Sequence, residues 1–317
     1  MASRRKINPS SKSNPDTGFG VQASQLGRRF VNKDGSFNVK KEGLPFWERM
    51  SVYSWLLDLS RTKFFLIIVA FYAVINIVFT ALYLLIGTNE LQGMDATTSW
   101  GILKEVFFFS TQTFTTVGYG RINPLHDGAD AIASIETLVG WLYFALVTGL
   151  MYGRFTRPQA YLSFSENALI SPYKNTKALM FRLVPYKSRH HLTEAHIAVN
   201  VAFMEMENEA PVYQFYTLKL ERDRVDSLSM NWTVVHPIDE ESPLLNFSEE
   251  DMHKADVEIY VQVIGFDHIF SNNVMQRTSY TSKEIVWDAK FAPMYYPSQD
   301  GALTILQLHK LNEYVRV

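Results

Sequence analysis

An uncharged apolar stretch over residues 64–86 constrains the fold of this 317-residue chain more than any other feature. A helix needs about 20 consecutive apolar residues to cross a bilayer, and core helices of soluble proteins seldom run so long without a charge. A second stretch, residues 131–152, carries one charge, Glu136, and two glycines, Gly140 and Gly149, which membrane helices tolerate. We therefore expect an outer membrane helix at 64–86 and an inner one at 131–155.

A short apolar segment and a polar, glycine-rich loop lie between these two stretches. The segment ILKEVFFFSTQT, residues 102–113, is too short to span a bilayer but apolar enough to enter one as a re-entrant helix. The loop TVGYG follows at residues 116–120. Non-helical backbone at membrane depth is tolerated only where it is buried in protein or lines water. The loop is therefore expected to line a pore or cavity.

TVGYG is identical to the loop that forms the selectivity filter of potassium channels, and this match identifies it. The backbone carbonyl groups of Thr116, Val117, Gly118 and Tyr119 can replace the water around K⁺ if four chains meet, and the Thr116 hydroxyl adds an inner ring. Gly118 and Gly120 allow backbone angles that other residues disfavour. The preceding helix would direct the partial negative charge of its C-terminus toward the cavity, which favours a cation.

Basic residues flank the outer ends of the two stretches. Arg61 and Lys63 precede the first, Arg154 and Arg157 follow the second, and the interval between them holds only Lys104 and Arg121. Because basic residues remain on the cytoplasmic side, both termini are expected to be cytoplasmic. The formal net charge of −2 does not suggest nucleic acid or another polyanion as a partner.

Two further segments precede the first stretch. Residues 1–43 are basic and rich in Ser, Gly, Asn and Pro, which predicts a disordered tail rather than a secretory signal peptide. In residues 44–62, apolar side chains recur at three- and four-residue steps. This pattern favours an amphipathic helix on the membrane surface, the alternative being a helix packed on a soluble domain. The chain has no cysteine, which excludes disulfides, thiolate metal sites and a cysteine nucleophile.

From residue 158 onward the pattern becomes one of short alternating segments separated by proline-containing breaks, which predicts a β-sandwich over 158–317. The residues expected to face its core are Ile197, Val199, Val201, Phe203, Val257, Ile259, Val261 and Val263. Residues 248–256 should form a short helix that begins at Ser248.

No motif in the chain indicates an enzyme or a cofactor. A phosphate-cradling loop and a GxSxG sequence are both absent. The pair His190–His191 lacks carboxylates at ligand spacing, so a solvated turn is favoured over a metal site. The only bound species expected is K⁺, as the permeant ion.

The chain resembles the prokaryotic inward-rectifier potassium channels, the bacterial Kir family. The filter alone indicates only a potassium channel, and the more specific match lies in SFSENALI (163–170), LTEAH (192–196), TVVHPIDEESPL (233–244), ADVEIYVQVIG (255–265) and RTSYTSKEIVW (277–287), with RFTRP (154–158) before them. The resemblance covers about residues 44–315. It implies a homotetramer of the inner (plasma) membrane, with a two-span α-helical pore and a cytoplasmic immunoglobulin-like sandwich that extends the pore.

The resemblance also implies roles for residues of the inner helix. Tyr152 falls at the bundle crossing, where a bulky side chain closes the gate. Phe144 lies two turns above it, at a position that is acidic in strongly rectifying members. Gly140 falls at the hinge, and Gly149 is a second hinge candidate.

Ligands of the channel follow from the same resemblance. Lys63, Arg154 and Arg157 match basic residues that meet anionic phospholipid headgroups, of phosphoinositide type in vitro. Glu194 matches a pore-lining acidic residue of the sandwich. Ba²⁺, Mg²⁺ and polyamines are the expected blockers.

Departures from the family pattern leave alternatives open. Ile264 stands at a second cytoplasmic acidic position, and Gln112 stands where animal members have a glutamate behind the filter. Together with Phe144, Ile264 puts strong polyamine-dependent rectification in doubt. One alternative is a membrane-anchored receptor or scaffold with a vestigial pore, for which an intact TVGYG has no use. Another is a channel gated by a nucleotide or Ca²⁺, which the missing Rossmann-type fingerprint disfavours.

Overall fold

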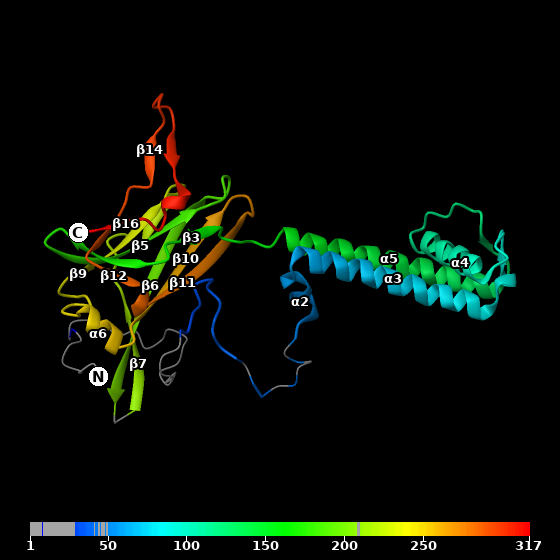
Figure 1. Cartoon of the computed structure of the whole chain (residues 1–317), viewed down its shortest axis with the longest axis horizontal. Helices are drawn as coiled ribbons and strands as arrows, with labels where there is room; N and C mark the ends of the chain where they lie inside the picture. The colour runs from blue at the N-terminus through cyan, green and yellow to red at the C-terminus, as the bar shows by residue number, and fades with distance from the viewer. Residues whose placement is uncertain are drawn as a thin grey trace. The chain divides into compact units, whose positions relative to one another are not determined.

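The computed structural model describes residues 8, 29–40, 42–43, 45, 48, 50–207 and 210–317 (Figure 1). The chain divides into two compact units, Glu42–Arg157 and a second unit that combines Met1–Lys41 with Pro158–Val317. Most of the expected tail, and much of the expected surface helix before residue 50, lie outside the described residues.

The first unit is helical and contains α2 (Val52–Asp58), α3 (Arg61–Ile86), α4 (Ser99–Phe114) and α5 (Asp127–Phe155). α3 and α5 are long and apolar enough to cross a membrane. α3 begins before residue 64 because the Ser60 hydroxyl accepts a hydrogen bond from the Lys63 amide and caps it. α5 begins before residue 131 because Asp127 and Asp130 fall in its first turn, where a helix favours negative charge.

The predicted surface helix is interrupted before residue 62. α2 ends at Asp58, and both Leu59 and Ser60 adopt extended backbone angles before α3 begins. α2 lies against the C-terminal end of α5, where a Cβ on Gly153 would approach the Tyr53 hydroxyl to 2.5 Å. This contact fixes where α2 meets the inner helix.

The second unit is a sandwich of two five-stranded sheets. One sheet has the strand order β11-β10-β6-β7 with β8 also paired to β6, and the other has the order β12-β4-β5-β3 with β9 also paired to β5. The bounds are β3 Leu162–Phe164, β4 Ala168–Tyr173, β5 Thr176–Pro185, β6 Leu192–Glu207, β7 Ala210–Thr217, β8 Arg224–Leu228, β9 Trp232–Ile238, β10 Glu258–Asp267, β11 Asn272–Thr281 and β12 Ile285–Trp287.

Smaller elements complete both units. β13 (Ala289–Phe291) pairs with β16 (Tyr314–Arg316), β14 (Tyr295–Pro297) pairs with β15 (Thr304–Leu306), and in the helical unit β1 (Leu91–Gln92) pairs with β2 (Asn123–Pro124). α6 (Glu249–Lys254) begins after a capping box between Ser248 and Asp251, which confirms the predicted start of that helix.

The core of the sandwich lies where the alternation of apolar and polar residues along the strands predicts it. All eight residues expected to face inward are at most 5% exposed. Val199 and Val261 are direct cross-strand partners of β6 and β10, so both alternations converge on one interior. The predicted β-sandwich is confirmed.

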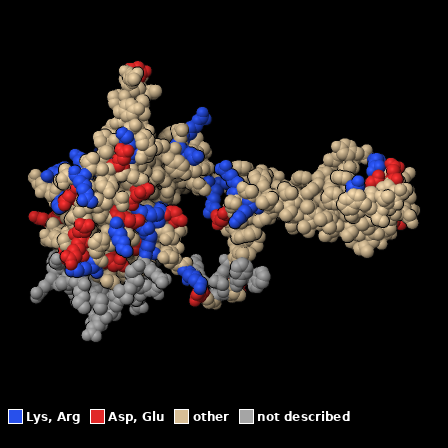
Figure 2. All heavy atoms as spheres, in the orientation of Figure 1, with Lys and Arg blue, Asp and Glu red and all other residues tan. Residues whose placement is uncertain are grey.

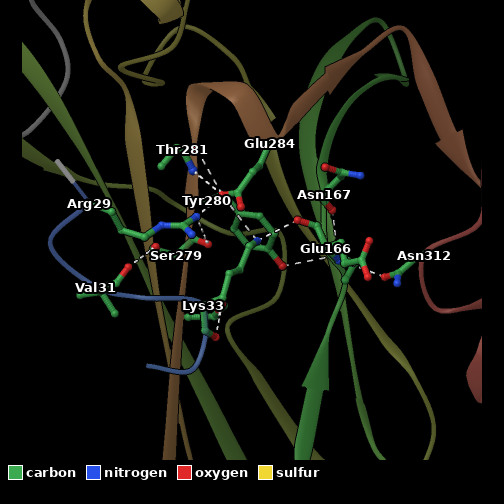
Figure 3. Close-up of polar contacts among 12 residues, drawn as sticks. Arg29, Val31, Lys33, Glu166, Asn167, Ser279, Tyr280, Thr281, Glu284 and Asn312 are labelled. Atoms are coloured by element: carbon green, nitrogen blue, oxygen red, sulfur yellow. Dashed lines mark hydrogen bonds and ion pairs between the residues drawn. The ribbon is translucent and has the colours of Figure 1, made fainter. Parts of the chain in front are cut away.

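A short N-terminal segment packs on this sandwich, so the expected disordered tail does not extend through residues 29–38 (Figure 3). Val31 pairs with Phe37 and is 2% exposed, within a cluster that includes Tyr213 and Tyr260. The Ser279 hydroxyl of β11 donates a hydrogen bond to the Val31 carbonyl oxygen.

Candidate functional site

The TVGYG loop, residues 116–120, begins two residues after the C-terminus of α4. The Thr116 amide donates to the carbonyl oxygen of Thr113 at 3.0 Å, and the Val117 amide donates to that of Gln112 at 2.9 Å. Thr116, Gly118 and Gly120 have positive φ angles of 60°, 56° and 81°, whereas φ is not positive at the intervening Val117 and Tyr119. In an extended strand, successive carbonyl groups point in opposite directions. When the sign of φ alternates from one residue to the next, successive carbonyl groups instead point toward one side of the loop.

A packed aromatic cluster supports the base of this loop. Phe114, the last residue of α4, is fully buried. Its ring lies 5.5 Å from those of both Tyr72 and Tyr143 and 6.4 Å from that of Phe144, measured between centroids. The Tyr72 ring meets that of Phe114 edge-on and the other two rings are tilted, and such aromatic packing is directional as well as apolar. It holds the end of α4 between α3 and α5.

The outer end of the loop is tied to the segment before α4. The side chain of Asn123 donates to the Gly120 carbonyl oxygen at 2.9 Å. Arg121 donates to Glu105 of α4 at 2.8 Å and to Asp95 at 3.2 Å. The other Glu105 oxygen accepts the amides of Asp95 and Ala96, each at 3.1 Å. The sequence interpretation missed these contacts, because Asp95, Glu105 and Arg121 are separated along the chain.

Two side chains of the loop are open in the single chain. Val117 is 52% and Tyr119 is 79% exposed. Behind the loop lies a hollow of about 270 Å³, lined by Gln112, Thr113, Thr116 and Thr137 among others. The rest of the single chain therefore leaves both side chains largely uncovered.

A buried carboxylate lies between the membrane helices. Glu136 of α5 is fully buried and accepts hydrogen bonds from the Ser110 hydroxyl of α4 and from the Tyr83 hydroxyl of α3. The sequence showed a single charge in the second span. It did not show the partners, which lie in two other helices.

The inner helix α5 is continuous from Asp127 to Phe155, and the two hinge candidates among its glycines, Gly140 and Gly149, have different surroundings. A Cβ on Gly140 would lie 2.1 Å from the Phe114 carbonyl oxygen, whereas a Cβ on Gly149 would have no atom within 4 Å. Phe144 is 47% and Tyr152 is 70% exposed in the single chain. Gly140 is thus required for close packing of α4, independently of any hinge.

The basic residues near the end of α5 do not share one environment. Arg154 donates to the carbonyl oxygens of Leu57 and Leu59, where α2 ends, and stacks on the Phe64 ring. Arg157 forms an ion pair with Asp58. Lys63 is exposed. In the helical unit, Figure 2 shows charged side chains toward both ends of α3 and α5 and none between them on the visible face.

Glu194 lies on an exposed face of the sandwich, at a break in strand pairing. The register of β6 and β10 shifts between Ile264 and Phe266, and Glu194 has a φ of 48°. Its side chain is 72% exposed and lies 3.7 Å from Arg224. Ile264, at the other position the family comparison singled out, is 39% exposed.

The expectation of a solvated turn is wrong for His190. Its Nδ1 lies 2.8 Å from the fully buried carboxylate of Asp267, and its ring packs against Tyr161 and Phe270. Among the described residues, no group of three or more His, Asp and Glu side chains is arranged to hold a metal ion. The contact between His190 and Asp267 therefore joins the end of β10 to the loop before β6.

Comparisons with known proteins show the family of the chain. A family model described as the inward rectifier potassium channel C-terminal domain matches residues 162–317, and one described as an ion channel matches residues 64–157. The inward rectifier potassium channel Kirbac3.1 of Paramagnetospirillum magnetotacticum is 32% identical over 89% of this chain and 95% of its own.

More distant matches add less. The ATP-sensitive inward rectifier potassium channel 12 of Gallus gallus is 25% identical over 86% of this chain and 68% of its own length. Among solved structures, the sporulation control protein Spo0M of Bacillus subtilis aligns with 41% of this chain and 50% of its own at 8% identity and a TM-score of 0.24, which is too low to indicate a shared fold. Channel sequences match both units, and the chain belongs to the inward rectifier potassium channel family.

Proposed function

We propose that four copies of this chain form a K⁺-selective channel with residues 116–120 as its filter. The family is one of ion channels rather than enzymes, and K⁺ is its permeant ion. The observation that carries the proposal is the positive φ angle at every second residue after α4, at Thr116, Gly118 and Gly120. Stacked rings of carbonyl oxygens that replace the hydration shell of K⁺ require this arrangement from each of four loops.

The exposed side chains of the loop support the tetramer. Val117 and Tyr119 are large apolar groups that neither α4 nor α5 covers. Trp141 and Leu138 of α5 are likewise 66% and 59% exposed. Packing against neighbouring copies would bury these surfaces and surround the ion on all sides. The complete filter is therefore a property of the assembly.

The gate is proposed on the inner helix. Four copies of Tyr152 at one level, with Phe144 above them, would form apolar constrictions that stop ions by excluding water. Gly149, which has no atom within reach of an added Cβ, leaves α5 free to bend between them. Gly140 remains a hinge candidate, with the constraint that its contact with Phe114 must be preserved.

Anionic phospholipid is the proposed regulator, and the channel is placed in the inner (plasma) membrane with both termini cytoplasmic. Lys63 is exposed at the start of α3, and Arg157 is partly exposed beside Asp58. A basic residue near an anionic surface contributes about 1 kcal/mol to binding. Arg154 is better explained as the residue that holds the end of α2 to α5, because carbonyl oxygens already accept from its guanidinium group.

The sandwich is proposed to contribute Glu194 to the cytoplasmic section of the pore. Arg224 partly offsets its charge, and Ile264 and Phe144 add none. Block by internal Mg²⁺ or polyamine should consequently be weak, while Ba²⁺, which competes with K⁺ in the filter, should block fully.

The test is ⁸⁶Rb⁺ uptake into liposomes that contain the purified protein. The wild-type protein should take up Rb⁺ in a Ba²⁺-sensitive manner, and Gly118→Ala should abolish uptake because a Cβ is disfavoured at its φ of 56°. Gly301→Ala is the matched control, since Gly301 has a φ of 69° in a surface turn of the sandwich. A folded wild-type tetramer without Ba²⁺-sensitive uptake would favour the scaffold alternative.

A further inference from the structure

The buried carboxylate behind the pore helix has no part in the proposed conduction pathway. Glu136 Oε1 accepts from the Ser110 hydroxyl at 2.5 Å, and Oε2 accepts from the Tyr83 hydroxyl at 2.8 Å. Glu136, Ser110 and Tyr83 are all fully buried. One side chain therefore joins α3, α4 and α5. Ionisable residues inside a membrane are costly and are kept where they have a function.

The contact persists whether or not Glu136 carries a proton. An ionised carboxylate accepts both hydroxyl protons. A protonated one can donate to the Ser110 oxygen, whose own proton then turns to Asn76, because the backbone oxygen and Oδ1 of Asn76 each lie 3.3 Å away. Ser110 stays bonded to Glu136 in both forms. The link thus depends on hydrogen bonding and not on charge.

A second contact lies one turn farther along both helices. Gly140 of α5 touches the carbonyl group of Phe114 of α4 so closely that a Cβ would lie 2.1 Å from the oxygen. Glu136 and Gly140 are one turn apart on α5, and Ser110 and Phe114 are one turn apart on α4. The two helices therefore meet at two successive levels, and the filter begins directly after the second.

We propose that Glu136 is a positioning residue for ion selectivity. By holding Ser110 it fixes the C-terminal half of α4 against α5, and with it the carbonyl oxygens of residues 116–119. This inference rests on the proposed function of that loop. A filter that can relax no longer favours loss of the K⁺ hydration shell over loss of the Na⁺ shell. Removal of the link should therefore admit Na⁺ before it stops conduction.

Substitutions at Glu136 separate hydrogen bonding from bulk. Glu136→Gln can still accept from Tyr83 and donate to Ser110, so its ratio of ²²Na⁺ to ⁸⁶Rb⁺ uptake should equal the wild-type ratio. Glu136→Leu is of similar size but has neither bond, and its ratio should rise at least about fivefold, the factor that corresponds to about 1 kcal/mol for one of the two lost hydrogen bonds.

A second pair of variants removes single hydroxyl groups. Ser110→Ala deletes one bond to Glu136 and should raise the ratio in the same direction. Ser134→Ala is the control on α5, because the Ser134 hydroxyl is exposed and donates to the Asp130 carbonyl oxygen of its own helix. Its uptake ratio should not change.

Wild-type uptake ratios in both Glu136→Leu and Ser110→Ala would overturn the inference. A Glu136→Gln channel as unselective as Glu136→Leu would also overturn it, since bonding would then not be the determinant. If Glu136→Leu does not assemble, Ser110→Ala decides alone. Failure of the proposed function looks different, because the wild-type protein itself would then show no Ba²⁺-sensitive Rb⁺ uptake.

Discussion

Replacing Gly140 by alanine should disturb the filter through packing alone. The added carbon would lie 2.1 Å from the Phe114 carbonyl oxygen, whereas ordinary van der Waals contact begins at 3.4 Å. The two helices must therefore separate by about 1.3 Å, which is the difference between these distances. The neighbouring atom is backbone and not the end of a flexible side chain, so the movement passes to α4.

The energetic cost follows from two opposing effects. Overpacking a well-filled interior costs about 1–3 kcal/mol. Alanine is favoured over glycine within a helix by about 1 kcal/mol. The net destabilisation at Gly140 should consequently be about 0–2 kcal/mol, small enough for the tetramer to persist. At Gly149, where no atom lies within 4 Å, only the favourable effect of about 1 kcal/mol applies.

The two glycine variants should thus differ in kind. Gly140→Ala should lower Rb⁺ uptake and raise the ratio of Na⁺ to Rb⁺ uptake, because the displaced α4 carries the filter. Gly149→Ala should keep the wild-type ratio while it slows opening, because a stiffer α5 bends less. Uptake in liposomes measures both quantities, and the thermal stability of the tetramer in detergent controls for folding. A Gly140→Ala protein with wild-type uptake, ratio and melting temperature would refute the packing argument.

Four further substitutions test other regions. Lys63→Ala should weaken the response of Rb⁺ uptake to anionic lipid about fivefold, since about 1 kcal/mol of binding is lost. Equal lipid responses in this variant and the wild type would contradict the lipid contact at Lys63. Arg154→Ala should instead lower the thermal stability of the tetramer before it changes the lipid response. Tyr152→Ala should raise basal Rb⁺ uptake, and a stable tetramer with wild-type uptake would place the gate elsewhere. Burial lowers the pKa of Lys33 from 10.5 to about 8 despite the nearby Glu284. Between these two pH values the unfolded chain therefore binds more protons than the folded chain, and the free energy of unfolding should rise with pH. Lys33→Met should lose that rise, as melting temperatures from pH 7.5 to 10 would show.

Periodicity made the sandwich predictable, because alternate residues of a strand share a face whatever strand lies beside them. Val201 and Ile259 are both buried and are partners across β6 and β10, although each was assigned from its own segment alone. The proposed filter was recognisable because five consecutive residues, 116–120, carry its motif. Features that are local in sequence were thus accessible without the structure.

Contacts between distant segments were not accessible in the same way. Glu136 was visible as a charge, but Ser110 and Tyr83 lie 26 and 53 residues away in sequence. His190 gave no sign of its partner Asp267, which is 77 residues distant. Residues 29–38 looked like part of a polar tail, and only the partners of Val31 in the folded sheet show why they are ordered. In each case the decisive information is which surfaces meet.

The docking of residues 29–38 has a consequence for biosynthesis. Val31 leaves the ribosome long before Ser279 of β11, the residue that binds its carbonyl oxygen 248 positions later. At about 5–20 residues per second, translation of that interval takes about 12–50 s. During this time the membrane helices are made, and the strands on which Phe30 and Val31 pack, β7, β10 and β11, appear only later and in turn. The N-terminal segment therefore completes its packing long after its own synthesis, and a chaperone can bind it during that interval.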